Sequence, residues 1–386
     1  MHSIAIIGAG PAGCYCAQAL AKALPDARID ILDARPVPYG LIRYGVAPDH
    51  QGTKAVIRQF ERLFERQGVQ FFGDVTLGRD VTLEALREMY DAVVLATGLD
   101  QDRKLGVPGD DLPGVLGSGV VTRAWNDAPD STPPQIGARV VVIGNGNVAV
   151  DLVRLLAKTD AECEGSDLTL TLPPVTRIDV VGRSPAEAAK FDPVMLKELG
   201  RLGAASIQVH GAEGEGKVIE ALATLNGHAP EGARCAVHFH FGWVPEAIEG
   251  DTRVTAARFA RGAERLSLPC DTVLTAIGFD GSRQEADVEG RIAPGLYTTG
   301  WARRGPRGTI PENRADAMQV AATIAADLGP GGKPRRDALA PLVPQAVGYA
   351  GWQRIDEAER AAAPEGRVRA KIRTRVAMLA LAQRGE

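Results

Sequence analysis

The sequence has few of the features that mark a secreted, a membrane-spanning or a metal-holding protein. The chain has only five cysteines, an odd number with no Cys-x-x-Cys pair, which argues against a disulfide framework and against a dithiol redox centre. The six histidines are dispersed, and His238 and His240, which would share one face of a strand, lack a third ligand. No apolar run is long enough to span a membrane, and a strand begins at Ser3, where a leader peptide would lie. We therefore expect a cytoplasmic protein.

An excess of either charge is also missing. The formal net charge is −4 over 386 residues, which gives no electrostatic drive towards nucleic acids or acidic membranes. With 45% hydrophobic and 24% charged residues, the composition is that of a globular protein long enough for two domains. Basic residues gather locally at Arg303, Arg304 and Arg307 and in the tail 367–375, where a solvated surface explains them as well as a binding role does.

A phosphate-binding fingerprint stands at the N-terminus, where an apolar run rich in β-branched residues leads into Gly-x-Gly-x-x-Gly and a helical pattern. Gly8 would make the tight turn, Gly10 would let the backbone approach a pyrophosphate, and Gly13 would let the helix pack on the strand. The start of that helix offers free N–H groups to phosphate, and Asp33, after the next strand, can accept hydrogen bonds from ribose hydroxyls. The pattern predicts a dinucleotide site without saying which dinucleotide. Its residues are Gly8, Gly10, Pro11, Ala12, Gly13 and Asp33.

The same device recurs after residue 138, as a buried strand, Gly-x-Gly-x-x-Ala and a helix. The strands that end at Gly98 and Gly278 occupy matching places in the two halves, and a small residue next to glycine suits close approach by a nucleotide. Arg183, not an acid, follows the strand after the second fingerprint, which favours a 2′-phosphate and hence NADP over NAD. The further predicted binding residues are Ala96, Thr97, Gly98, Gly144, Asn145, Gly146, Asn147, Val148 and Arg183.

This repeat predicts an α/β protein with two Rossmann-like (three-layer ββα/αβ) dinucleotide-binding domains, the second inserted into the first. We expect the first domain to comprise residues 1–104 and 300–386 and the second to comprise 105–299, with a hairpin-like region at 220–244. Two such folds suit a flavin and a nicotinamide placed face to face. Hydride transfer between them needs a separation of about 3–3.5 Å, and the flavin can then release its electrons one at a time.

Three long segments resemble the adrenodoxin reductase type of ferredoxin–NADP⁺ reductase: 36–50, 144–151 and 300–310. The resemblance covers nearly the whole chain. It implies FAD on the N-terminal fold, NADPH on the inserted fold and electron delivery to a ferredoxin-type iron–sulfur protein.

The resemblance also implies further site residues. His50 and Asp151 stand in motifs that are similar to the family's polar pair near the redox centre, with orientation and proton management as their catalytic role; plain structural hydrogen bonding is the alternative. The residues expected to line the flavin, or to meet its rings and pyrophosphate, are Gly40, Leu41, Val46, Trp301, Gly308, Thr309 and Ile310.

One departure from the family pattern bears on the second cofactor. The family's Gly-Arg-Arg-Gly-Pro stands here as Gly182-Arg183-Ser184-Pro185, and losing one arginine should weaken the preference for NADPH. NADH or dual use therefore stays open. Two other functions also stay open: a flavoprotein reductase (diaphorase) of small acceptors such as quinones, and an FAD electron-transfer subunit with a weakened nicotinamide site.

Overall fold

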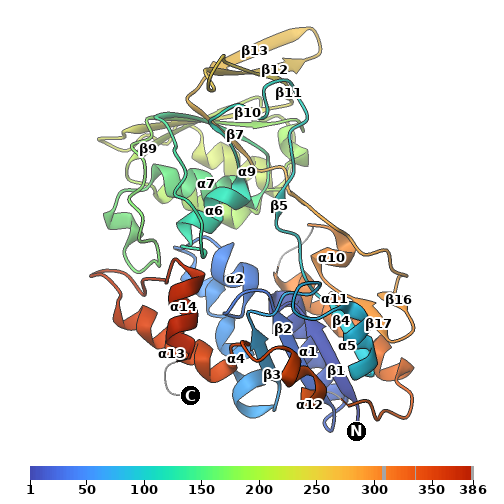
Figure 1. Ribbon diagram of the computed structural model, residues 1–386. Coiled ribbons are helices and arrows are strands. Elements are labelled where there is room, and N and C mark those ends of the chain that lie inside the picture. Colours follow the sequence, from blue (N-terminus) through green and yellow to red (C-terminus); the bar gives the residue numbers. More distant parts are fainter. Residues whose placement is uncertain (307–309, 335, 384–386) are drawn as a thin grey trace. The chain divides into compact units, whose positions relative to one another are not determined.

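The computed structural model describes residues 1–306, 310–334 and 336–383 and divides into two compact units (Figure 1). Unit 1 comprises Met1–Gln101, Asn126–Asp130 and Phe279–Glu386, and unit 2 comprises Asp102–Trp125 and Ser131–Gly278. Unit 2 is thus inserted into unit 1. This division differs from the predicted boundaries after residues 104 and 299, because the chain after 279 already packs in unit 1, where its strands extend the sheet.

Unit 1 is built on one six-stranded sheet in the order β16-β17-β4-β1-β2-β3. Its neighbouring strands pair in parallel, except β16 and β17, which are antiparallel. None of the helices in the described part of the chain is long and apolar enough to cross a membrane. The strands and helices of unit 1 are β1 (Ser3–Ile7), α1 (Pro11–Ala23), β2 (Arg28–Asp33), α2 (Gly40–Tyr44), α3 (Gln51–Lys54), α4 (Ile57–Arg66), β3 (Gln70–Gly73), α5 (Leu83–Met89), β4 (Ala92–Leu95), β16 (Arg291–Ala293), β17 (Leu296–Thr298), α10 (Trp301–Arg304), α11 (Ile310–Asp327), α12 (Arg336–Leu339), α13 (Tyr349–Ala361) and α14 (Arg375–Ala382).

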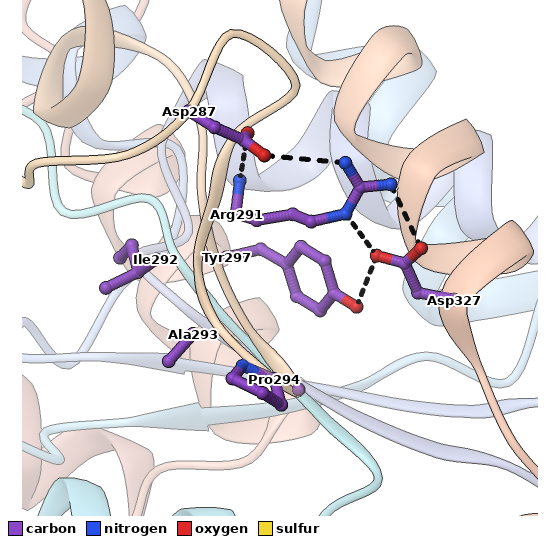
Figure 2. A pocket seen from close by; sticks show the side chains of 8 residues that line it. Asp287, Arg291, Ile292, Ala293, Pro294, Tyr297 and Asp327 are labelled. Carbon is purple, nitrogen blue, oxygen red and sulfur yellow. Dashed lines mark hydrogen bonds and ion pairs between the residues drawn. The ribbon is translucent and has the colours of Figure 1, made fainter.

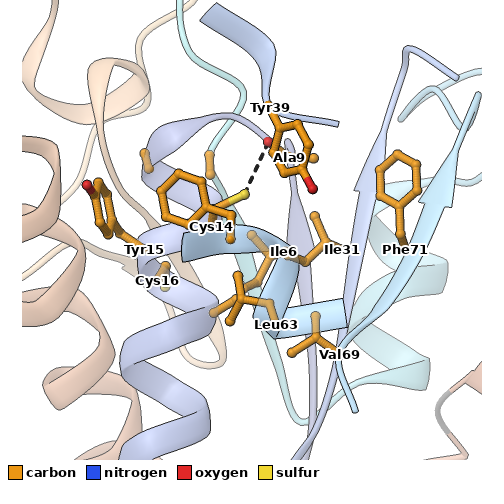
Figure 3. Packing of buried hydrophobic residues seen from close by; sticks show 14 of the residues in the cluster. Ile6, Ala9, Cys14, Tyr15, Cys16, Ile31, Tyr39, Leu63, Val69 and Phe71 are labelled. Carbon is orange, nitrogen blue, oxygen red and sulfur yellow. Dashed lines mark hydrogen bonds between the residues drawn. The ribbon is translucent and has the colours of Figure 1, made fainter. Parts of the chain in front are cut away.

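Both faces of this sheet are buried, which explains the unbroken apolar run of β1. Ile4 and Ile6 join the core on the face covered by α1 and α11, whereas Ala5 and Ile7 join the core on the face covered by α5. Figure 3 shows the first of these cores around Cys14, whose thiol donates a hydrogen bond to the carbonyl of the fingerprint loop. Burial raises the pKa of this thiol well above its usual range, so the cysteine packs as an apolar side chain.

Unit 2 has a six-stranded sheet in the order β6-β14-β7-β8-β10-β9, in which neighbouring strands pair in parallel. A three-stranded antiparallel sheet, β11-β12-β13, packs on one face through Phe259 and Leu268, which contact the Val141 and Val273 side of the parallel sheet. The elements of unit 2 are β6 (Val115–Gly117), α6 (Ser118–Trp125), β7 (Arg139–Ile143), α7 (Asn147–Ala157), β8 (Arg177–Gly182), α8 (Pro193–Glu198), β9 (Ala205–His210), α9 (Lys217–Leu225), β10 (Cys235–Phe241), β11 (Val244–Glu249), β12 (Ala256–Arg261), β13 (Glu264–Pro269) and β14 (Thr272–Thr275). The chain first passes from unit 1 to unit 2 at β5 (Gln101–Asp102), visits unit 1 at Asn126–Asp130, and returns to unit 1 for good at β15 (Phe279–Asp280).

The prediction of a hairpin at 220–244 is wrong. The region holds the helix α9 followed by β10, a central strand that pairs in parallel with β8 and β9. α9 buries Ala221, Leu222 and Leu225, and this i, i+1, i+4 spacing is helical. A helical crossover is also what two parallel strands require.

Candidate functional site

Both fingerprint loops lie where the strand order of their sheet reverses. β1 stands between β2 and β4 in unit 1, and β7 stands between β8 and β14 in unit 2. At such a point the connections leave to opposite sides and open a crevice at the carboxyl ends of the strands, which is where open α/β sheets bind ligands. The chain after β4 reaches this edge of unit 1 with Ala96 buried, Thr97 exposed and Gly98 half-buried.

The three glycines of the first loop meet different demands. Gly8 has φ +113°, and a Cβ on it would lie 2.4 Å from the Ala96 carbonyl oxygen. A Cβ on Gly13 would lie 1.9 Å from the carbonyl oxygen of Gly8, so the helix could not approach the strand as it does. A Cβ on Gly10 would meet nothing within 4 Å beyond its neighbours in the chain. The fold therefore explains Gly8 and Gly13 but leaves open space at Gly10, and that space fits a pyrophosphate.

Asp33 ties the end of β2 to the fingerprint loop. Its carboxylate accepts hydrogen bonds from the backbone N–H of Ala9 at 2.8 Å and of Arg35 at 2.9 Å. Burial raises the pKa of Asp33, against the opposing effects of the Arg35 charge and these two hydrogen bonds. Each carboxylate oxygen keeps further acceptor capacity, so the same side chain can also accept from a ribose hydroxyl.

The predicted residue Gly40 lies directly against the loop. A Cβ on Gly40 would be 3.0 Å from the Cα of Gly10, and the preceding Tyr39 donates its N–H to the Ala9 carbonyl at 2.9 Å. Tyr39 has φ +80°, a costly conformation for a tyrosine. Its fully buried ring, packed edge-on to Trp352, holds it there and fixes the entry to α2.

Leu41, Val46 and His50 follow in the same segment and are half-buried. Val46 donates its N–H to the Leu41 carbonyl at 2.8 Å and accepts at its own carbonyl from the side chain of Asn126 at 3.0 Å. His50 donates its N–H to the Ala47 carbonyl at 3.0 Å. The backbone of the predicted flavin-lining segment is thus fixed by hydrogen bonds within unit 1.

Trp301 opens α10 beside the start of α1. A Cβ on the preceding Gly300 would lie 2.5 Å from the Cβ of Ala12, and the indole of Trp301 stacks on Phe279 with ring centroids 5.6 Å apart. Its Nε1 is buried and has no hydrogen-bond partner among the described residues. A buried donor of this kind fits an acceptor on a bound flavin. The predicted residues Gly308 and Thr309 lie outside the described residues, and Ile310 is the first residue of α11.

Asp316 of α11 connects this helix to residues 299–303, which include the start of α10. It accepts hydrogen bonds from the Gly300 N–H at 2.6 Å and the Thr299 hydroxyl at 2.8 Å, and it pairs with Arg303. Burial pushes the pKa of Asp316 upwards, but the hydrogen bonds from Gly300, Arg303 and Thr299 outweigh it and hold the pKa below its usual range. No local sequence pattern points to Asp316, because its partners Thr299, Gly300 and Arg303 precede the helix that carries it.

We expect Asp316→Asn to destabilise the protein by about 3 kcal/mol at neutral pH, because it leaves the Arg303 charge without its carboxylate. A carboxylate whose pKa is depressed by folding stabilises above its unfolded pKa, and that contribution is lost as the pH falls through the folded value. The difference in unfolding free energy between wild type and variant should therefore shrink below about pH 4. Urea unfolding across pH tests this, and a constant difference down to pH 2 would contradict it.

The second loop repeats the construction of the first. Gly144 has φ +142°, and a Cβ on it would lie 2.2 Å from the Ala276 carbonyl oxygen, while one on Gly146 would meet nothing within 4 Å. The third position is Ala149, which is fully buried. The open position at Gly146 again fits a pyrophosphate.

The two asparagines of the second loop differ in whether their side chains have hydrogen-bond partners. Asn147 accepts from the Asp192 N–H at 2.7 Å and so has a structural partner. The side-chain nitrogen and oxygen of Asn145 are buried without partners among the described residues, which fits a polar group on a ligand. Lys190, which the sequence reasoning missed, donates its N–H to the Asn145 carbonyl at 2.7 Å and places an exposed cation beside the loop. Val148 is the second residue of α7.

The two residues predicted to be catalytic lie in different units. Asp151, on α7, accepts from Arg154 at 2.5 Å, and Arg154 also lies 3.5 Å from Glu198. Burial lowers the pKa of Arg154 to about 10 despite the nearby carboxylate of Glu198. Asp151 thus has a structural partner, and its pairing with His50 stays a prediction.

A surface pocket in unit 1 lies away from these loops. Figure 2 shows Arg291 between Asp287 and Asp327, with the Tyr297 hydroxyl donating to Asp327 at 3.1 Å. The pocket surrounds the residues just before β17, at the amino edge of the parallel strands, whereas the fingerprint loop stands at the carboxyl edge. In the part of the chain that the structure describes, no group of three or more His, Cys, Asp or Glu side chains could hold a metal ion.

Two dinucleotide folds, each with an open glycine at a switch point, define a pyridine-nucleotide oxidoreductase that uses two nucleotides. Accordingly, residues 2–222 match the family described as pyridine nucleotide-disulphide oxidoreductase. The chain is 44% identical to the cindoxin reductase of Citrobacter braakii, covering 99% of this chain and 91% of that protein. It is 33% identical to the NADPH-ferredoxin reductase FprA of Mycobacterium tuberculosis, over 96% of this chain and 97% of that protein.

The fold agrees with these sequence matches. The structure of Mycobacterium tuberculosis FprA in complex with NADPH matches this one with a TM-score of 0.92 at 32% identity, over 99% of both chains. The chain therefore belongs to the adrenodoxin reductase-type ferredoxin–NADP⁺ reductases. The predicted family, the two-Rossmann fold class and the class of enzyme, an FAD- and NADPH-using reductase of ferredoxin-type iron–sulfur proteins, are confirmed.

Proposed function

We propose that the loop of unit 1 holds FAD, that the loop of unit 2 holds NADPH, and that the protein passes hydride from NADPH to FAD and then single electrons to an iron–sulfur protein. The observation that carries this assignment is the matched pair of open glycines, Gly10 and Gly146, beside glycines whose positions the backbone itself dictates. The unit 1 loop is covered by Gly40 and has the buried donor of Trp301 in its unit, and these features suit the larger flavin nucleotide.

The chain's own residues would bind and orient the two nucleotides. The first N–H groups of α1 and α7 bind pyrophosphate, because a helix N-terminus has unpaired donors and a positive dipole end. Asp33, which also accepts from the Ala9 N–H, would accept from the FAD ribose, and the buried Nε1 of Trp301 would donate to the flavin. His50 and Asp151 hold or move a proton near the redox centre. FAD supplies the conversion of a two-electron donor into one-electron delivery.

Gly146→Ala tests the assignment of the second loop. We expect the variant to keep FAD but to lose reduction by NADPH by roughly 100-fold, because the new methyl group occupies the space into which the pyrophosphate would approach. Gly203→Ala is the matched control, since Gly203 is an exposed glycine of the same unit without a positive φ. Anaerobic stopped-flow measurement of flavin absorbance gives the rates, and an unchanged rate in Gly146→Ala would refute the assignment.

A choice of acceptors separates the proposal from the diaphorase alternative. The NADPH-reduced protein should reduce cytochrome c rapidly only when a ferredoxin-type iron–sulfur protein is added. Rapid turnover with a quinone and none through any iron–sulfur protein would favour the small-acceptor reductase instead. The cytoplasmic location stays a prediction, which cell fractionation tests.

A further inference from the structure

Among the described residues of the turn that follows β8, where the 2′-phosphate of NADPH is expected, one carries a positive charge. Such a phosphate carries nearly two negative charges and favours forked arginine donors. β8 ends at Gly182, and the next two residues are Arg183, which is exposed, and the uncharged Ser184. A site that selects NADPH would gain from a second cation at this turn.

The end of β10 is bonded to this same turn. The Trp243 N–H donates to the Gly182 carbonyl at 3.0 Å, and the Gly242 N–H donates to the Ser184 carbonyl at 3.0 Å. These two bonds fix the 182–184 turn against residues 242–243. Residues 242–243 therefore adjoin the turn that is expected to contact the ribose.

Arg261, the last residue of β12, is packed there. Its guanidinium carbon lies 4.4 Å from the centroid of the Trp243 ring, in a cation–π contact. A Cβ on Gly242 would be 3.5 Å from the Arg261 Cδ, and a Cβ on Gly211 would be 3.9 Å from its Nη1. Arg261 of the antiparallel sheet thus lies beside the carboxyl ends of β9 and β10.

The guanidinium of Arg261 has a hydrogen-bond donor that no described residue uses. The Glu264 carboxylate accepts hydrogen bonds from Nε of Arg261 at 3.0 Å and from Nη2 at 2.7 Å, whereas Nη1 makes no hydrogen bond to any described residue. Both side chains of the pair are about half exposed or more, at 47% and 61%, so the pair is weak and can yield to a phosphate. A dianionic phosphate competes well against a single solvated carboxylate.

We propose that Arg261, held by Trp243, is a specificity-determining residue that supplies the second cation for the 2′-phosphate of NADPH, in place of an arginine at position 184. This inference rests on the proposed assignment of NADPH to unit 2. The antiparallel sheet β11-β12-β13 would then contribute a residue to the NADPH-binding site.

Binding of 2′,5′-ADP and of 5′-AMP to the FAD-loaded protein, measured by calorimetry, tests the proposal without turnover. Arg261→Ala should weaken 2′,5′-ADP about 10- to 100-fold and leave 5′-AMP unchanged, because only the former carries the 2′-phosphate. Arg265→Ala is the matched control: Arg265 lies on the neighbouring strand, is 51% exposed and pairs with Glu246. It should change neither affinity.

Two further variants follow from the same geometry. Glu264→Gln should strengthen 2′,5′-ADP binding several-fold, because it removes the competing carboxylate. Ser184→Arg, added to Arg261→Ala, should restore the lost affinity. An Arg261→Ala protein that binds 2′,5′-ADP as tightly as wild type, or that loses both nucleotides equally, overturns the proposal. Failure of the proposed function is a separate result, since it shows as a flavin that NADPH does not reduce even though 2′,5′-ADP binds.

Discussion

Gly10→Ala should release FAD while leaving the fold intact. The new Cβ would meet no protein atom within 4 Å, so the free energy of unfolding of the FAD-free protein should change by no more than about 1 kcal/mol. The methyl group would instead occupy the space into which we place the FAD pyrophosphate. Losing two hydrogen bonds to a charged group costs roughly 3–6 kcal/mol, so FAD should bind at least 100-fold more weakly. Flavin fluorescence on dilution or dialysis measures the loss.

The controls for Gly10→Ala distinguish cofactor loss from misfolding. Gly52→Ala places a methyl group in equally open space on α3 and should retain FAD. Gly13→Ala should instead lower both stability and FAD content, because its Cβ would collide with the Gly8 carbonyl oxygen at 1.9 Å. Full FAD retention by Gly10→Ala would show that the first loop does not hold the pyrophosphate.

Glu359→Gln should cost about 3–5 kcal/mol of stability, the usual consequence of leaving a buried charge without its partner. The Glu359 and Arg43 side chains pair with each other while only 0% and 3% exposed. Arg43 lies on α2, inside the predicted flavin-lining segment. Its guanidinium carbon packs over the Trp352 ring, 4.9 Å from the ring centroid. We therefore expect FAD retention to fall along with stability.

Chemical unfolding of the FAD-free protein measures the cost of Glu359→Gln. Glu357→Gln, on the exposed side of the same helix, is the matched control and should change stability by less than about 0.5 kcal/mol. Equal effects of the two substitutions would contradict the account of the buried pair.

The glycine fingerprints were predictable because they encode local geometry. Gly8 and Gly144 turn the chain at positive φ against the backbone of the neighbouring strand, and only glycine does this without strain. The spacing of these glycines is therefore visible in the sequence without knowledge of the fold. The pairing of Arg261 with Trp243 is not visible in this way, because strand twist and register decide which side chains of β12 reach the end of β10.

The unit boundaries were harder to predict for a related reason. Residues 126–130 return to unit 1 through contacts with the tail, where Arg373 pairs with Asp127 at 2.8 Å and accepts at its carbonyl from the Asp130 N–H. Arg375 likewise pairs with Asp74. The basic tail looked like a solvated surface or a binding patch in the sequence, but Arg373 and Arg375 are paired with acids distant in the chain. Such pairings depend on the folded chain and leave no local pattern.

The central claim is that one loop holds the flavin and the other holds the nicotinamide that reduces it. Anaerobic titration of the FAD-loaded protein with NADPH, followed by flavin absorbance, tests it most directly. We expect one equivalent of NADPH to bleach the flavin fully in the wild type, and Gly146→Ala to retain its flavin but to resist bleaching. A wild-type flavin that neither NADPH nor NADH reduces would contradict the account.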